Sequence, residues 1–258
     1  MRPRRWYIEK AQTTARLPAV GHIMRYMAMF LFFLFFFSAA SAALLSIAAP
    51  KRHFAIPGHQ NEWFVIYQGG APIGSIHSTI SEIGNDAWGE DAVFEIRNET
   101  VVKALVGGKQ TISIFNVLEI VDERLRLKRF EAVARIAGRE VRMRGDMEDE
   151  VLNVEIVEGG ERTVRQALVP YGCVPVSLLP VFLASFDPEK GGGRGVCTVG
   201  YRIDDVAVER VHVEAPTPAG ADSGASDAFI YRIKNPDYRS VMLMTRGGRV
   251  LEETQPLL

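Results

Sequence analysis

Two cysteines are the residues of this chain best suited to covalent chemistry. Cys173 and Cys197 both lie in the C-terminal half, and neither belongs to a CxxC pair or has a histidine close by in the sequence. Three alternatives stay open for them: a disulfide bond between the two, two independent free thiols, or one reactive or metal-ligating thiol.

The histidines show no metal-binding pattern. There are five, with no HxxxH, HxH or Cys/His cluster among them: His22, His53, His59, His77 and His212. The chain also lacks a GxSxG elbow, a P-loop and a GxGxxG that opens a helix. We therefore expect no cofactor, no metal site and no enzymatic activity.

The charges are unevenly distributed. Residues 1–50 hold six basic side chains and one acid, whereas the remainder holds 24 basic and 30 acidic residues, a net charge of −6. A mildly acidic domain lacks the basic clusters that bind phosphates, which excludes nucleic acid as a partner. Adjacent acids such as Glu252 and Glu253 lie in strand-like segments, so we expect them to be solvated charges on opposite faces.

An uncharged apolar stretch near the N-terminus indicates that the chain is targeted to a membrane. Residues 27–49 carry no charge over 23 positions, enough for a helix to cross a bilayer. Two interpretations stay open, an uncleaved transmembrane anchor and a cleaved signal peptide. Residues 1–26 form a basic cytoplasmic tail or n-region, and the positive-inside rule places the rest of the chain in the periplasm or outside the cell, anchored to the inner membrane or secreted after cleavage.

The rest of the chain has the pattern of a single β domain. A linker at 50–61 precedes a domain at 62–258, in which β-branched and aromatic residues alternate with charges between glycine-rich turns. Such alternation is typical of antiparallel sheets with one wet face. Strands are predicted near Trp63–Tyr67, Ile73–Ile83, Asp91–Val106, Gln110–Val121, Arg124–Ile136, Glu140–Asp146, Val151–Val157, Thr163–Val169, Val196–Ile203, Val206–Val213, Ala228–Ile233, Ser240–Thr245 and Arg249–Glu253.

One segment departs from this pattern. Val174–Phe186 is apolar on nearly all sides and contains Pro175 and Pro180. A buried helix, kinked or split at Pro180, fits this composition, and so do two buried strands or an irregular apolar loop. With the helix, the predicted fold is mainly β, a curved antiparallel meander or half-barrel wrapped around one apolar helix, plus the N-terminal transmembrane or signal helix.

The start of the β domain carries a family resemblance. The run from Trp63 to His77, WFVIYQGGAPIGSIH, resembles the opening of the N-terminal β domain of bacterial membrane-anchored transglutaminase-like proteins. That domain is similar in style to periplasmic lipoprotein-carrier half-barrels (LolA/LolB-like). The resemblance covers about residues 62–254 and excludes the catalytic module, because no such module follows. Gly74 fits a bulge or a close backbone approach in the returning strand.

These observations predict a binding or accessory module. Its partners would be the membrane, a lipid or acyl ligand, and a transglutaminase-like or envelope protein. A structural or assembly protein of the cell envelope is the alternative, and an enzyme is the least favoured class. The candidate ligand-lining or groove-lining residues are Trp63, Tyr67, His77, Leu178, Phe182 and Phe186.

Overall fold

Nearly all of the described chain is β structure. The computed structural model describes residues 4–8, 59–68, 70–83, 93–106, 109–189, 192–220, 227–235 and 238–254. Eight long strands follow one another in the first part of the sheet: β2 (His59–Gln68), β3 (Ala71–Glu82), β4 (Phe94–Val106), β5 (Lys109–Val121), β6 (Leu127–Ile136), β7 (Arg139–Glu148), β8 (Val151–Glu158) and β9 (Glu161–Leu168). The remaining elements are β1 (Arg4–Ile8), β10 (Val174–Pro175), η1 (Val176–Leu178), α2 (Leu179–Ala184), β11 (Arg194–Arg202), β12 (Asp205–Val213), β13 (Thr217–Pro218), β14 (Ala228–Asn235), β15 (Tyr238–Thr245) and β16 (Val250–Thr254).

The 16 described strands form one sheet. Its order is β10-β11-β12-β14-β15-β16-β1-β2-β3-β4-β5-β6-β7-β8-β9, and β13 pairs with β14 outside this path. Neighbouring long strands are antiparallel, so the predicted mainly β, antiparallel architecture is confirmed. Two short strands pair in parallel, β10 with β11 and β1 with both β16 and β2.

The alternation in the sequence explains why the strands face as they do. In β6, Phe130, Ala132 and Ala134 are buried while Glu131 and Arg135 are exposed. Because successive side chains of a strand point to opposite faces, this pattern gives the sheet an apolar inner face and a charged outer face. Each of the thirteen predicted strands corresponds to a strand of the structure, with shifts of a few residues at the ends.

Two boundaries differ from the sequence prediction. The expected linker at 50–61 overlaps β2, because His59, Gln60 and Asn61 pair with β3 and extend the strand. The short strand β13 was not among the predicted strands. In both places the local sequence is rich in polar residues or proline, and the partner strand supplies the order that the local pattern does not predict.

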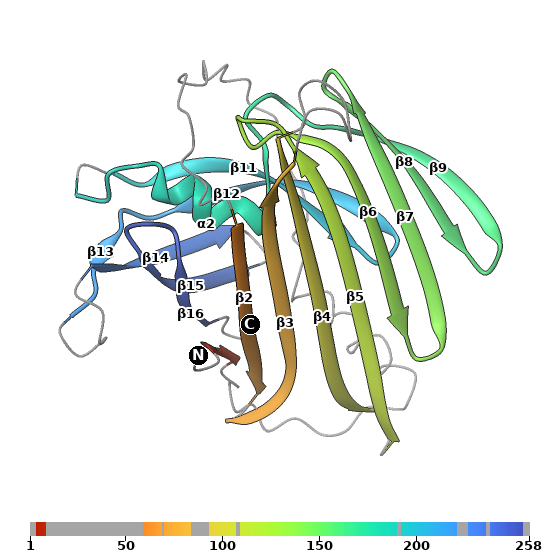
Figure 1. The fold of residues 1–258 in the computed structure, drawn as a ribbon, viewed down its shortest axis with the longest axis horizontal. Coiled ribbons are helices and arrows are strands. Elements are labelled where there is room, and N and C mark those ends of the chain that lie inside the picture. The colour runs from red at the N-terminus through yellow and green to blue at the C-terminus, as the bar shows by residue number, and fades with distance from the viewer. Residues whose placement is uncertain are drawn as a thin grey trace.

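The sheet curls so that its two halves face each other. Figure 1 shows β3–β6 passing in front of β11 and β12, with β14–β16 on the side of β2 and α2 beside the upper end of β2. One apolar core joins residues of β2–β5, η1, α2, β11, β12 and β14–β16, and a second joins β6–β8 to β11 and β12. The inner face of one half is thereby buried against the inner face of the other half.

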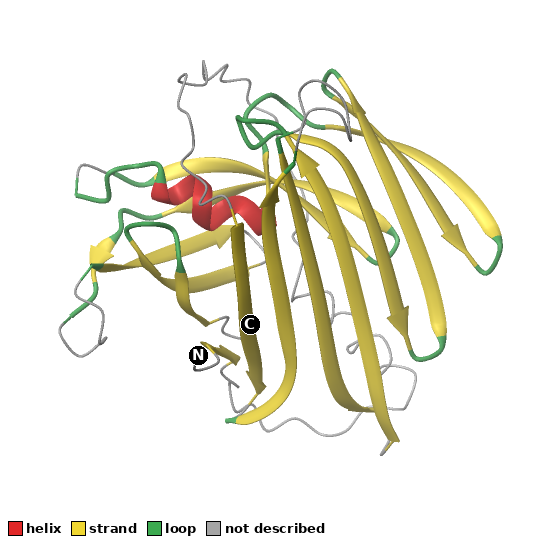
Figure 2. Ribbon diagram, viewed as in Figure 1, coloured by secondary structure: helices red, strands yellow, loops and turns green. Residues whose placement is uncertain are grey.

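The helix is shorter than the predicted apolar segment. Val174–Phe186 divides into β10, η1 and the six-residue α2, coloured red in Figure 2. Pro180 stands at the start of α2, where a missing N–H costs nothing, and this placement explains why the helix begins there. Leu179 and Leu183 of α2 enter the apolar core, so the helix fills space inside the curled sheet.

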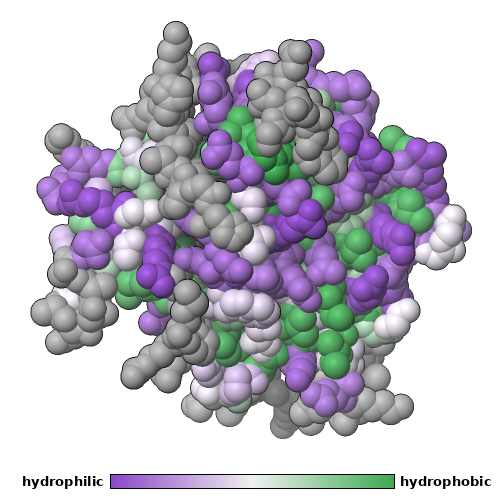
Figure 3. Space-filling model, in the orientation of Figure 1, coloured by the Kyte–Doolittle hydropathy of each residue, from purple (hydrophilic) through white to green (hydrophobic). Residues whose placement is uncertain are grey.

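The outer face of the sheet is predominantly polar. Figure 3 shows hydrophilic residues over much of the face formed by β3–β7, with scattered apolar residues between them. Arginine–glutamate pairs such as Arg135–Glu140 and Arg162–Glu155 join neighbouring strands there. In the part of the chain that the structure describes, no helix is both long and apolar enough to cross a membrane. The candidate span at 27–49 lies outside the described residues.

Candidate functional site

A cavity of about 190 Å³ lies inside the curled sheet, partly open to solvent. It forms where the inner faces of β2–β5 meet β11, β12, β14–β16 and the η1–α2 segment. Its walls are largely apolar, with side chains that come from both halves of the sheet and from the helix: Phe64, Ile76, Ile80, Val181, Val199 and Val211. An apolar cavity of about 150 Å³ can hold benzene, so this one has room for a small apolar group.

Glu119 places a carboxyl in this apolar wall. It lies on β5 with 1% of its surface exposed, and Ser177 of η1 donates a hydrogen bond from its hydroxyl to a Glu119 carboxylate oxygen. Burial raises the pKa of Glu119 from 4.5 to about 7, while the hydroxyls of Ser177 and Tyr201 oppose that shift. Near neutral pH the carboxyl therefore exchanges between its acid and its anion.

Tyr201 of β11 lies next to this carboxyl. Its side chain is buried, and its phenol oxygen has no hydrogen bond of regular geometry with the described residues. Burial and the neighbouring Glu119 carboxylate both raise the pKa of Tyr201 well above 10, so the phenol stays protonated. The cavity thus holds a weak acid beside a phenol that has hydrogen-bonding capacity left over.

Two further acids line the same cavity, and one of them corrects a prediction. Glu253, expected as a solvated charge, is buried and accepts a hydrogen bond from the Ser240 hydroxyl at 2.6 Å. Glu252 and Glu253 point to opposite faces of β16, and the sequence alone does not say which face is buried. The curling of the sheet covers the face that carries Glu253. Glu62 of β2 is half-buried, and burial raises its pKa above 4.5. Its carboxylate lies 3.8 Å from the Arg249 guanidinium.

The three residues proposed from the Val174–Phe186 segment lie beside the cavity but not in its lining. Leu178 is fully buried within the apolar core, and Phe182 packs against the same core. Phe182 and Phe186 contact each other edge to face, and the Arg194 guanidinium lies 3.8 Å from the Phe186 ring centre. These side chains hold the helix against the sheet and thereby support the cavity wall.

The three residues proposed from the first strands lie apart from the cavity lining. Trp63 is 55% exposed and stacks on His77, with ring centres 4.1 Å apart. The Asn61 side-chain oxygen lies 2.9 Å from the His77 ring nitrogen. Tyr67 is half-buried. Trp63, Val65 and Tyr67 share one strand face, as the period of two predicts, but the cavity takes Phe64 from the other face.

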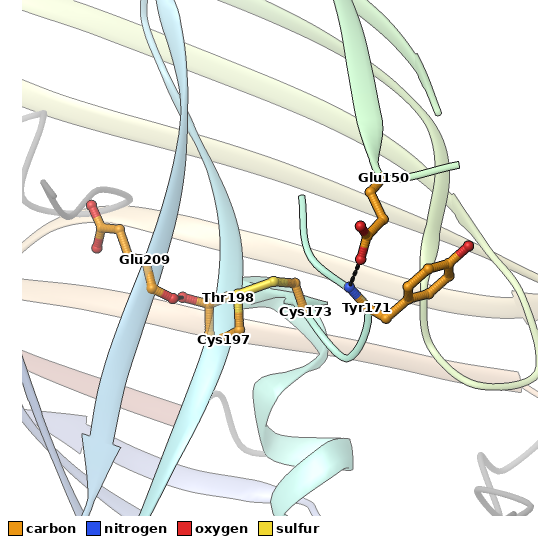
Figure 4. The surroundings of a disulfide bond; sticks show 6 residues. All are labelled: Glu150, Tyr171, Cys173, Cys197, Thr198 and Glu209. Atoms are coloured by element: carbon orange, nitrogen blue, oxygen red, sulfur yellow. Dashed lines mark hydrogen bonds between the residues drawn. A yellow bond between two sulfur atoms is a disulfide. The ribbon is translucent and has the colours of Figure 1, made fainter. Parts of the chain in front are cut away.

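The structure joins Cys173 and Cys197 in a disulfide bond. The bond ties the turn after β9 to β11, as Figure 4 shows. Nearby, the Tyr171 N–H donates to the Glu150 carboxylate at 2.9 Å, and the Thr198 hydroxyl donates to the Glu209 carbonyl oxygen at 3.4 Å. The disulfide therefore fixes the approach to β10 and η1, which carry Ser177 into the cavity wall.

Glu119 is the residue that the sequence analysis missed. It stands in the run Asn116 to Val121, NVLEIV, at an alternate position shared with Val117 and Val121. A single acid at an inward position of an otherwise apolar strand is an available sequence signal for a buried carboxyl. Among the described residues no group of three or more histidines, cysteines or acids is placed to hold a metal ion.

Among known proteins, the fold has a structural neighbour. No family model matches the chain, and no curated protein matches it. This neighbour is the crystal structure of a β-barrel-like protein of domain of unknown function DUF1849 from Brucella abortus. The match covers 69% of this chain and 80% of that chain, with 14% sequence identity and a TM-score of 0.45.

Proposed function

We propose that this protein is a binding module that holds a small apolar ligand in the cavity between the two halves of its sheet. The carrying observation is a largely apolar cavity of about 190 Å³, partly open to solvent, between the two halves of the sheet. Protein interiors are packed almost without voids, so a space of this size is uncommon unless something occupies it. A few polar groups in an apolar wall are typical of small-molecule sites, where they orient the ligand.

The proposed location is outside the cytoplasm. Two features support it: the uncharged segment at 27–49 and the Cys173–Cys197 disulfide. Disulfides persist in oxidising compartments and are rare in the cytosol. In this proposal the domain faces the periplasm or the cell exterior, either anchored by the 27–49 segment or released after its cleavage.

Mass spectrometry of the full chain tests the binding proposal. The protein is purified without detergent exchange, and its mass is measured under native and denaturing conditions. We expect extra mass in the native spectrum that is lost on denaturation and matches a small apolar compound. A native mass equal to the polypeptide mass, with no uptake when apolar compounds are added, would contradict the proposal.

A second candidate function, a structural or assembly role in the cell envelope, is favoured by strand β9. It ends the sheet, and its side chains Val164 and Leu168 are 64% and 67% exposed. An exposed edge strand with apolar side chains is a site at which another chain can add a strand. An envelope protein, including a transglutaminase-like enzyme, is the proposed partner.

Charge substitutions at the edge strand separate this role from ligand binding. When proteins are crosslinked in membranes, the double variant V164K/L168K should no longer form a crosslink to the partner. In its native mass spectrum the double variant should still carry the extra mass of the ligand. Retention of the same partner by the double variant would exclude β9 as the docking strand.

A further inference from the structure

The charge of the cavity lining narrows the class of ligand. Three glutamates line the cavity, Glu62, Glu119 and Glu253, and its other polar side chains are uncharged. None of the lining residues in the described part of the chain is a lysine, an arginine or a histidine. An anionic head group entering this space would meet carboxylates and no cation of the lining.

Among the three glutamates, Glu119 is the one whose anion depends most for its stability on the contents of the cavity. Its described contacts are with two hydroxyl groups, those of Ser177 and Tyr201. Hydroxyl groups donate hydrogen bonds to a carboxylate but do not neutralise it, and a buried anion without a counter-charge is costly. A cationic group close to Glu119 would remove that cost, whereas a second anion would increase it.

A second polar group beside Glu119 also points to a ligand at the same place. The Tyr201 phenol is buried beside Glu119 and lacks a hydrogen bond of regular geometry among the described residues. Buried hydroxyl groups are nearly always hydrogen-bonded in folded proteins. A ligand head group next to Glu119 would lie within reach of this phenol oxygen, which can accept a hydrogen bond from an ammonium group.

We infer that the ligand of this cavity is an alkyl amine, whose ammonium group lies against the Glu119 carboxylate and whose hydrocarbon chain lies against the apolar wall. The inference rests on the proposed binding function and adds the charge of the ligand to it. It excludes fatty acids, because a carboxylate head would face Glu119 at short range.

Three probes of equal chain length test the charge. Octylamine, octan-1-ol and octanoate are titrated into the full-length protein at pH 8 by calorimetry. Octylamine should bind at least tenfold more tightly than octanoate, with octan-1-ol between them. Octanoate or octan-1-ol binding as tightly as octylamine would overturn the inference and leave the binding function standing. If none of the three binds, the proposed function fails and the inference fails with it.

Matched variants separate the site from general attraction to an acidic protein. E119Q keeps the shape of the side chain and removes its charge, so the preference for octylamine over octanoate should fall at least tenfold. E131Q, on the exposed face of β6, removes the same charge outside the cavity and should keep the preference. If E119Q does not fold, S177A serves as a second variant, because it removes one of the two hydroxyl groups that contact Glu119 and keeps the carboxyl. S177A should retain the preference for octylamine, and a preference for octanoate in S177A would overturn the inference.

Discussion

Glu119 shares the inward face of β5 with three apolar residues, Phe115, Val117 and Val121. Its place in the wall explains the shift of its pKa to about 7, because burial disfavours the anion more than the two hydroxyl groups stabilise it. A residue with this property is costly to keep in a core, and the proposed ligand binding would supply a reason for keeping it.

The raised pKa of Glu119 predicts how stability changes with pH. Between pH 4.5 and 7 the folded state holds a proton that the unfolded state has lost, so stability falls as pH rises and levels off above the folded pKa. The loss is on the order of 3 kcal/mol for a shift of this size. Burial also raises the pKa of Glu62, which contributes a smaller slope of the same sign.

Urea unfolding at pH 5, 6, 7 and 8 measures this slope. The E119Q variant should show a flatter dependence of the unfolding free energy on pH than the parent protein, with E131Q as the control that keeps the parent slope. Equal slopes in the parent and E119Q would show that Glu119 does not carry a raised pKa in the folded state.

Particular residues show how far the sequence alone leads. Phe130, Ala132, Val141 and Met143 were predictable as core from their period of two, because alternation is a local property. Gly74 was also predictable: a side chain there would overlap the Val101 carbonyl oxygen, and the register of β2 and β3 shifts beside it. The burial of Glu253 and the closeness of Ser177 to Glu119 depend on contacts 13 and 58 residues apart, which no local pattern contains.

At the scale of elements, the η1–α2 segment and β11 are held in place by the Cys173–Cys197 disulfide. The bond closes a loop of 24 residues that includes β10, η1 and α2. A cross-link over a loop of this length stabilises a domain mainly by restricting the unfolded chain. The cavity wall made by Ser177 and Val181 belongs to this loop, so its position depends on the cross-link.

Reduction of the disulfide should destabilise the protein without abolishing its sheet. We expect the free energy of unfolding to fall by about 2–4 kcal/mol when urea unfolding is followed with a reductant present. The double variant C173S/C197S should show the lower stability in either condition and no response to the reductant. An unchanged midpoint for the parent protein after complete reduction would contradict this role.

At the scale of the whole molecule, the place of β1 has a consequence for membrane attachment. β1 pairs in parallel with β16 on one side and with β2 on the other. A membrane span at 27–49 would put residues 4–8 and β2 on opposite sides of the bilayer. One molecule therefore cannot both pair β1 with β16 and β2 and span the membrane with residues 27–49. In a molecule anchored by residues 27–49, β1 would be missing from its place between β16 and β2.

Removal of residues 1–50 tests whether β1 is needed for the fold. The described apolar cores are built from residues between Phe64 and Val250, so the shortened protein should keep its β-type circular dichroism and unfold cooperatively. Loss of cooperative unfolding in the shortened protein would show instead that β1 is an essential part of the sheet.

The central claim, that the cavity binds a small apolar ligand, is tested most directly by filling the cavity. Ser78 of β3 lines it, whereas Ser75 lies on the same strand with its side chain on the opposite face. The measurement is a calorimetric titration of octylamine into the parent protein, S78L and S75L. We predict one binding site in the parent, affinity at least tenfold weaker in S78L, and parent affinity in S75L. Equal binding by S78L and the parent would contradict the claim.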